Sequence, residues 1–245
     1  MSKQFLHGWM ESLLFVLAAS TVGTASAQGN TTQIFTPPGM PVLTDPGSVR
    51  ILPSSEIDSA ASPFTSDKRA EMAAARQAAK KRGWNEVTEA QAKRVDSYFD
   101  RPESRNRLRA LHEIVNDLRV MPAALSGTAL ANAEFLGASP SGAFAAGGWT
   151  GLVRAFTVPK FGRVVLEEFD YAAAGTQITV PREMIDGDVN GKPMITDSYR
   201  APSGNGYTEF TWFTDHKQFI LRIGQYVPEK SGLRADIHTL MSQLY

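Results

Sequence analysis

The sequence predicts an α+β fold: N-terminal helices followed by an antiparallel β-meander, which a C-terminal helix covers. Apolar residues recur at helical spacing between residues 66 and 122. From Thr150 onward the pattern changes to β-rich runs separated by turn residues. Residues 231–244 again carry apolar side chains on one helical face. Packing this helix on the meander is the natural way to bury both apolar faces.

Residues 1–27 have the composition of a signal peptide. Lys3 and the amino terminus supply weak positive charge, and residues 12–19 form a short apolar run. Ala25-Ser26-Ala27 then fits the small-x-small pattern that signal peptidase accepts. The run is shorter than the ~20 apolar residues of a spanning helix, and no later segment reaches that length. We therefore expect a mature chain that has no transmembrane segment and is periplasmic or secreted.

Composition excludes several classes of function. The chain contains no cysteine, which excludes disulfides, thiolate metal sites and cysteine nucleophiles. The 25 basic and 25 acidic residues balance, so electrostatics does not favour a nucleic-acid partner. Between Ser66 and Arg119 there are 13 basic and 9 acidic residues. A solvated helix face explains this small excess best, with an anionic lipid surface or an acidic partner as the alternatives.

Residues 28–65 are predicted to form a disordered Pro-rich tail. This segment holds six prolines, and no periodicity survives that density of helix and strand breakers. We expect it to provide reach towards a partner. The alternative is a peptide that adds a strand to a partner, for which Ile51-Leu52 is one of few apolar pairs.

Three helices are expected between residues 66 and 122. The first runs from Ser66 to Arg82 and is mostly alanine, so it has high helix propensity and little to bury. Thr88-x-x-Gln91 is a capping box that opens the second helix. The third begins at Pro102 and should pack antiparallel to the second through a stripe at helical spacing: Leu108, Leu111, Val115 and Leu118.

Residues 123–148 are unusually rich in small side chains, with 9 Ala, 5 Gly and 3 Ser. This composition predicts a helix from about Thr128 to Leu136 and a flexible connector from Gly137 to Gly148. No phosphate-binding pattern is present in it. The segment should therefore be the boundary between a helical region, residues 66–148, and a sheet region, residues 149–245.

The sheet region is expected to contain two hairpins. Strands are predicted at residues 152–158, 163–171, 177–180, 207–213 and 218–223. With Asp215-His216 as a two-residue turn, Trp212 faces Phe219 and Glu209 faces Arg222. The Trp212 side should be buried beneath three residues of the C-terminal helix: Ile237, Leu240 and Leu244.

One segment has the spacing of a metal site. Residues 186–197 resemble the calcium loop of the EF-hand, with oxygen ligands from Asp186, Asp188, Asn190, Asp197 and the carbonyl of Lys192. Asp stands in place of the usual final Glu, and the flanking residues do not indicate helices. The alternative is a pair of polar turns, Asp186-Gly187 and Asn190-Gly191, that join strands. Apart from this weak calcium site, we expect no cofactor.

Other catalytic patterns are absent from the sequence. The three histidines beyond residue 27 have no metal-site spacing, so we expect His112, His216 and His238 in surface or turn positions. Glu167 and Glu168 are adjacent on a strand and point to opposite faces, so they cannot act as a catalytic pair. They should instead form cross-strand ion pairs.

These observations favour a non-enzymatic, exported envelope protein with a binding or accessory role and another envelope protein as its partner. Two alternatives stay open: a periplasmic carrier that holds an apolar ligand between sheet and helix, and a hydrolase with dispersed catalytic residues. A packed core would favour the binding protein, an apolar tunnel the carrier, and converging polar groups in a cleft the hydrolase.

Export is directly testable, because cleavage after Ala27 should leave Gln28 as the mature amino terminus. Intact-mass measurement of the exported protein checks this. Retention of the first 27 residues would make the protein membrane-anchored and contradict the prediction.

Overall fold

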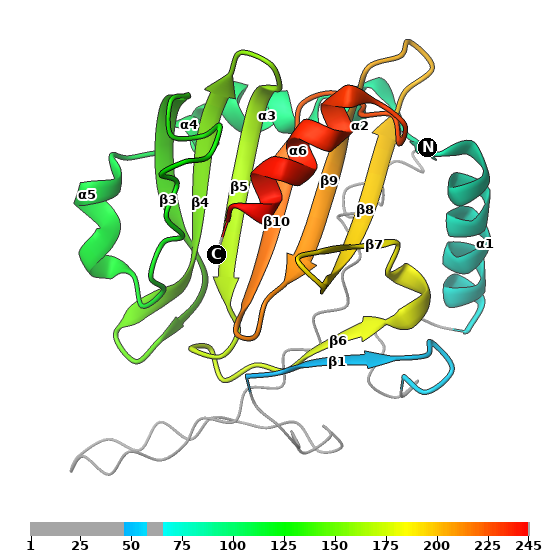
Figure 1. Cartoon of the computed structure of the whole chain (residues 1–245), viewed down its shortest axis with the longest axis horizontal. Coiled ribbons are helices and arrows are strands. Elements are labelled where there is room, and N and C mark those ends of the chain that lie inside the picture. The colour runs from blue at the N-terminus through cyan, green and yellow to red at the C-terminus, as the bar shows by residue number, and fades with distance from the viewer. Residues whose placement is uncertain (1–46, 58–65, 245) are drawn as a thin grey trace, which may run out of the picture.

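The fold is α+β, as predicted, and is built on an eight-stranded sheet with the helix α6 (Gly232–Ser242) across one face (Figure 1). The computed structural model describes residues 47–57 and 66–244. The predicted signal peptide and most of the predicted Pro-rich tail lie outside these described residues. We call the two sides of the sheet the α6 face, which carries Phe210 and Trp212, and the opposite face, which carries Glu209.

Along the sheet the strand order is β2-β8-β9-β10-β5-β4-β3, and β7 also pairs with β8. The bounds are β2 Asn85–Glu86, β3 Glu134–Ala145, β4 Gly148–Val158, β5 Gly162–Asp170, β7 Gly187–Val189, β8 Lys192–Arg200, β9 Gly206–Phe213 and β10 Lys217–Ile223. A separate two-stranded ribbon pairs β1 (Val49–Leu52) with β6 (Ile178–Pro181) in parallel.

The expected arrangement of a plain antiparallel meander after a block of helices is wrong in two respects. The sheet is mixed, because β2 runs parallel to β8. The helices also do not form one block at the start of the chain, since β1 precedes them and β2 interrupts them. The interrupted helices are α1 (Ser66–Arg82), α2 (Glu89–Ala92), α3 (Arg94–Asp100), α4 (Pro102–Arg105) and α5 (Leu111–Ile114), the last continued by the short 3-10 helix η2 (Val115–Asp117).

The main core lies between the α6 face and α6. Strands β9 and β10 pair with Trp212 opposite Phe219 and Phe210 opposite Leu221, so the predicted hairpin register is confirmed. The two rings of the first pair are stacked, with centroids 5.0 Å apart. Three residues of the C-terminal segment are buried over this face as expected: Ile237, Leu240 and Leu244.

The opposite face is covered by two different elements. Near one end of the strands, Val95 and Phe99 of α3 pack on Val153 and Val165. Near the other end, the β1–β6 ribbon and the residues around it pack on β8 and β9, in a cluster that includes Ile178, Val180, Ile195 and Phe213. The middle of this face therefore lies between two apolar clusters.

Part of the predicted disordered tail is ordered. Residues 49–52 form β1, and the backbone N–H of Ser54 donates to the carboxylate of Glu183 at 3.1 Å. The apolar pair Ile51-Leu52 thus adds a strand to this chain's own β6, opposite Val180 and Pro181. Pro181, the last residue of β6, is tolerated in such a two-stranded ribbon because it breaks no central ladder.

The helical predictions succeed up to residue 100 and fail after it. Helix α1 has the predicted bounds and ends at Gly83, whose φ is +83°, and the capping box of Thr88 and Gln91 is present. The expected third helix is instead broken, because the backbone of Arg109 exchanges two hydrogen bonds of 2.8 Å with Ala138 of β3. This pairing with the sheet overrides the helical stripe and leaves Val115 43% exposed.

The predicted helix at 128–136 and flexible connector at 137–148 are also wrong, because residues 134–145 form β3. The small residues serve close packing. Gly137 and Gly142 lie at the two bulges of β3 with φ of +136° and +74°. A Cβ on Gly137 would lie 2.8 Å from the Cβ of Leu108, so glycine is required where the backbone comes this close.

The core packing predicts large effects at two aromatic residues. Truncating Trp212 or Phe210 to alanine should lower the free energy of unfolding by about 3–5 kcal/mol, because each is fully buried beneath α6. Val115→Ala is the matched control and should change it by less than about 0.5 kcal/mol. Urea denaturation measures both, and a small effect at Trp212 would contradict this core.

Candidate functional site

The predicted calcium loop forms a β-hairpin. Asn190 and Gly191 lie at its turn with φ of +52° and +76°, which supports the alternative of a polar turn between strands. The side chain of Asp188 accepts a hydrogen bond from the N–H of Gly191, and that of Asp186 accepts from Thr196. Among the described residues, no group of three or more His, Asp or Glu side chains is placed to hold a metal ion.

The three histidines occupy the surface positions that the sequence indicates. His112 is exposed on α5, and His216 is exposed in the β9–β10 turn. His238 is exposed on α6, where a ring nitrogen lies 2.9 Å from the carbonyl oxygen of Asp188. Among the described residues, none of these rings forms a hydrogen bond with a charged side chain of the sheet.

Glu167 and Glu168 point to opposite faces and form separate ion pairs, as predicted. On the α6 face, Glu168 is fully buried and binds the guanidinium of Arg154, with Lys217 at 3.6 Å. The same carboxylate accepts a hydrogen bond of 2.7 Å from the N–H of Ala123. A buried carboxylate needs such partners to offset its desolvation. We infer that this cluster stabilises the fold, because it binds the segment after η2 to the sheet.

The opposite face carries a second charged cluster, which we call the polar band: Asp197, Glu209, Arg222 and Glu167. Strand pairing sets Asp197 directly opposite Glu209, and Glu209 directly opposite Arg222. Arg222 donates to Glu209 at 2.6 Å and to Glu167 at 2.8 Å. The exposed fraction of the side chain rises from 2% at Glu209 to 28% at Glu167, so the band is open at its Glu167 end.

Glu209 and Glu167 are each ion-paired with Arg222, whereas Asp197 lies opposite another carboxylate, Glu209. Burial raises the pKa of Asp197 from 3.8 to about 6, and the negative charges of Glu209 and Asp186 act in the same direction. The charge of Arg76 on α1 and a hydrogen bond from Asn85 on β2 partly oppose this rise. Asp197 therefore exchanges its proton near pH 6, beside a glutamate that is paired with arginine.

Three tyrosines surround the polar band. The rings of Tyr199 and Tyr207 stack with centroids 4.5 Å apart, and Tyr98 of α3 packs in the same cluster. Burial, together with the charges of Asp197 and Glu209, raises the pKa of Tyr199 well above its ordinary value. The phenols thus stay protonated at neutral pH and can donate hydrogen bonds.

In chemical terms, the polar band offers a proton donor beside a carboxylate. Directly opposed residues of an antiparallel pair have Cβ atoms about 4.5–5.5 Å apart. Two carboxyl groups at about 5 Å, one protonated and one ionised, are the pair that retaining glycosidases use. The ion pair with Arg222 and the burial of Glu209 weigh against this use, since a substrate must reach both carboxyl groups.

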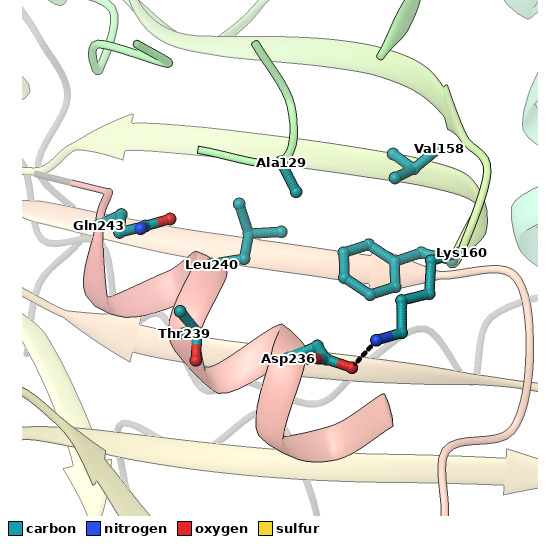
Figure 2. A pocket seen from close by; sticks show the side chains of 8 residues that line it. Ala129, Val158, Lys160, Asp236, Thr239, Leu240 and Gln243 are labelled. Carbon is teal, nitrogen blue, oxygen red and sulfur yellow. Dashed lines mark ion pairs between the residues drawn. The ribbon is translucent and has the colours of Figure 1, made fainter. Parts of the chain in front are cut away.

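A separate shallow pocket lies along one side of α6 (Figure 2). Its volume is about 250 Å³, and its apolar floor comes from Val158, Phe161 and Leu240. The ion pair between Lys160 and Asp236 crosses it. It is smaller than the roughly 300–1,000 Å³ of most ligand pockets, and its floor belongs to the main core.

Sequence reasoning found Glu209 and Arg222 as a pair but missed their neighbour Asp197. The sequence analysis places Asp197 in a calcium loop, with a pair of polar turns joining strands as the alternative. Neither interpretation gives a strand register for Asp197. The Asn190-Gly191 turn was the available signal, because Asn-Gly between two β-rich runs is the strongest short-range indication of a hairpin.

Comparison with known proteins adds no family to this description. No protein-family model, curated protein or solved structure matches the chain. In the part of the chain that the structure describes, no helix has both the length and the apolar character needed to cross a membrane.

Asp197→Asn tests the environment of this carboxyl group. Because the pKa of Asp197 is higher in the folded protein, about 6, than its ordinary 3.8, the folded state holds the proton more tightly. The stability contribution of Asp197 is therefore lost as pH rises through this window. Asparagine stays neutral, so the variant should be more stable than wild type by about 1–3 kcal/mol near pH 8 and equal to it below about pH 4. Urea unfolding across this range measures the difference.

Asp215→Asn is the control of opposite sign. Lys192 lowers the pKa of Asp215 through a hydrogen bond and its charge, so the contribution of Asp215 is present at neutral pH and lost as pH falls. If both variants changed stability in the same direction with pH, the protonated, buried state of Asp197 would be wrong.

Calcium binding at residues 186–197 stays a prediction. A site with three carboxylates and one amide should be weak, with a Kd on the order of 10⁻⁴–10⁻³ M. Calorimetry at millimolar calcium tests it, with Asp186→Ala as the comparison. Equal heats from the two proteins would rule the site out.

Proposed function

We propose that this chain is an exported, non-enzymatic binding or accessory protein of the cell envelope, periplasmic or secreted, whose partner is another envelope protein. The packed interface between α6 and the sheet carries the proposal. Side chains from β5, β9, β10 and α6 fill this interface, where a carrier would hold its apolar ligand. The pocket at the margin of α6 is too small for an acyl chain or a comparable ligand.

Further support comes from the way the charged residues are used. On the α6 face, Glu168 forms an ion pair with Arg154. On the opposite face, Glu209 forms an ion pair with Arg222. Side chains held in such buried ion pairs stabilise one arrangement of the strands and are less available to act on a substrate. The signal-peptide pattern of residues 1–27 supports export.

Helix α1 offers a surface for a protein partner. Of its side chains with described exposure, Ala79 is buried and Arg76 is half-buried, and the others are exposed. The exposed side chains of this 17-residue helix are therefore available to a partner.

In-cell photo-crosslinking tests the proposal. A photo-reactive residue replaces Gln77 on α1 in the full chain, and the adduct is identified by mass spectrometry. We expect one discrete adduct with an envelope protein. A matched position on α6, Thr239, is also exposed and should give a different or weaker adduct if α1 forms the interface. Adducts at neither position would contradict the proposal.

A hydrolase acting on glycosidic bonds is the second candidate, because Asp197 and Glu209 are directly opposed in the polar band. This candidate predicts that Asp197→Asn and Glu209→Gln both abolish turnover of a glycan substrate, whereas Glu167→Gln retains it. Turnover by wild type that survives both substitutions would exclude this pair as catalytic residues.

A further inference from the structure

The turn between β3 and β4 is built from apolar residues at a position where polar ones are favoured. Ala146 and Gly147 form it, with φ of +45° and +85°. Ala146 and Asn190 are the two non-glycine residues in the described chain with positive φ. Asn and Gly are preferred in this conformation because Asn tolerates it and Gly has no Cβ, whereas Ala is strained there.

A second hairpin of this chain makes the contrast clear. The β7–β8 turn has the same pattern of two positive φ values and uses Asn190-Gly191. There the side chain of Asn190 donates to the carbonyl oxygen of Ser242 at 2.9 Å. The β3–β4 turn keeps Ala at the equivalent place and accepts the strain, although Ala146 is exposed. The turn therefore has no polar side chain, and the strain at Ala146 lowers its local stability.

Exposed aromatic residues flank the strained turn. Phe144 is 63% exposed and Trp149 is 36% exposed, and their rings meet edge to face with centroids 5.5 Å apart. These two residues are directly opposed across the hairpin. We call Phe144, Ala145, Ala146, Gly147 and Trp149 the hairpin tip. No charged residue occurs from Phe135 to Val153, a run of 19 residues.

A positive charge lies at the base of the tip. The N–H of Arg119 donates to the carbonyl oxygen of Trp149 at 2.8 Å, which fixes this arginine beside the tip. Its side chain is exposed. Indole and phenyl rings next to a segment that carries an exposed arginine suit the boundary between the acyl chains and the headgroups of a bilayer, where the rings enter the apolar layer and the arginine meets anionic phosphate.

We propose that the β3–β4 hairpin tip docks this protein on an anionic lipid surface. The tip enters the interface to a depth of about 5–10 Å, as other peripheral apolar elements do. At the tip, strands β3 and β4 pair with each other through Phe144 and Trp149 and through Ala145 and Gly148, so entry leaves few backbone groups unsatisfied. Such a convex, uncharged tip needs no partner of complementary shape, which favours a bilayer over a protein.

This inference deepens the proposed envelope function by naming a surface of attachment. Partition onto vesicles needs no protein partner, so its failure and the failure of the crosslinking experiment at α1 are separate results.

Vesicle binding tests the proposal. The exported protein is mixed with vesicles of phosphatidylglycerol and phosphatidylethanolamine, and binding is followed by co-sedimentation and tryptophan emission. We expect binding with a blue shift of the emission. The double substitution of Phe144 and Trp149 to alanine should weaken partition about tenfold or more, because two aromatic contacts with the bilayer are lost. Equal partition of this variant and wild type would overturn the proposal.

Two further variants separate docking from folding. Ala146→Asn should raise the melting temperature, because Asn suits the positive φ, yet weaken vesicle binding, because it makes the tip polar. Phe135→Ala is the matched control, since Phe135 is 42% exposed at the far end of the same strand, and it should leave binding unchanged. Stronger or unchanged binding of Ala146→Asn would contradict the proposal.

Lipid charge and direct contact supply the last checks. Arg119→Gln should weaken binding to phosphatidylglycerol vesicles and leave the weaker binding to phosphatidylcholine vesicles unchanged. A photo-reactive residue in place of Phe144 should form an adduct with lipid in cells. A protein adduct at this position instead would show that the tip docks on a protein and would overturn the assignment to lipid.

Discussion

Every residue of β9 is buried, and the rest of the structure depends on this constraint. A strand buried on both faces needs a layer on each side, and every polar group on it needs a partner. On the α6 face the requirement is met by aliphatic and aromatic packing around Phe210 and Trp212. On the opposite face the strand carries Glu209, which is stable there because Arg222 is directly opposite it. The predicted register of this pair is confirmed, and its glutamate is buried.

The parts of the fold that local patterns determine were predictable. Helix α1, the capping box at Thr88 and the β9–β10 register each follow from residues that are close in sequence. The failures have a common physical cause, which is pairing between distant segments. Arg109 bonds to Ala138, and Ile51 pairs with Val180, and neither contact leaves a trace in local periodicity. The prediction of a flexible connector at Gly137 failed for the same reason. Glycine is needed there because the backbone lies close to Leu108, and not for flexibility.

The candidate site was partly predictable for similar reasons. The pair of Glu209 and Arg222 follows from one hairpin, but the polar band also needs Asp197 from β8 and Glu167 from β5, whose positions depend on the strand order. Only the assembled sheet brings Glu209 and Glu167 to the same guanidinium and sets Asp197 beside Glu209. Burial on the assembled sheet is the main reason why Asp197 holds its proton to about pH 6, and the negative charges of Glu209 and Asp186 add to it. The order of the strands therefore affects the protonation state of Asp197, because it buries this residue beside Glu209.

Helix α1 has a consequence for how the molecule opens. Among the side chains of α1 whose exposure is described, Ala79 is the one that is buried, so these side chains add little to the cooperative unit formed by the sheet and α6. The amide hydrogens of α1 should exchange through a local opening whose free energy is far below that of global unfolding, and Gly83, with positive φ, is the point at which this helix separates from β2. We therefore expect the sheet and α6 to unfold as one unit and α1 to open separately, with a change in the surroundings of Asp197, on whose pKa the charge of Arg76 acts.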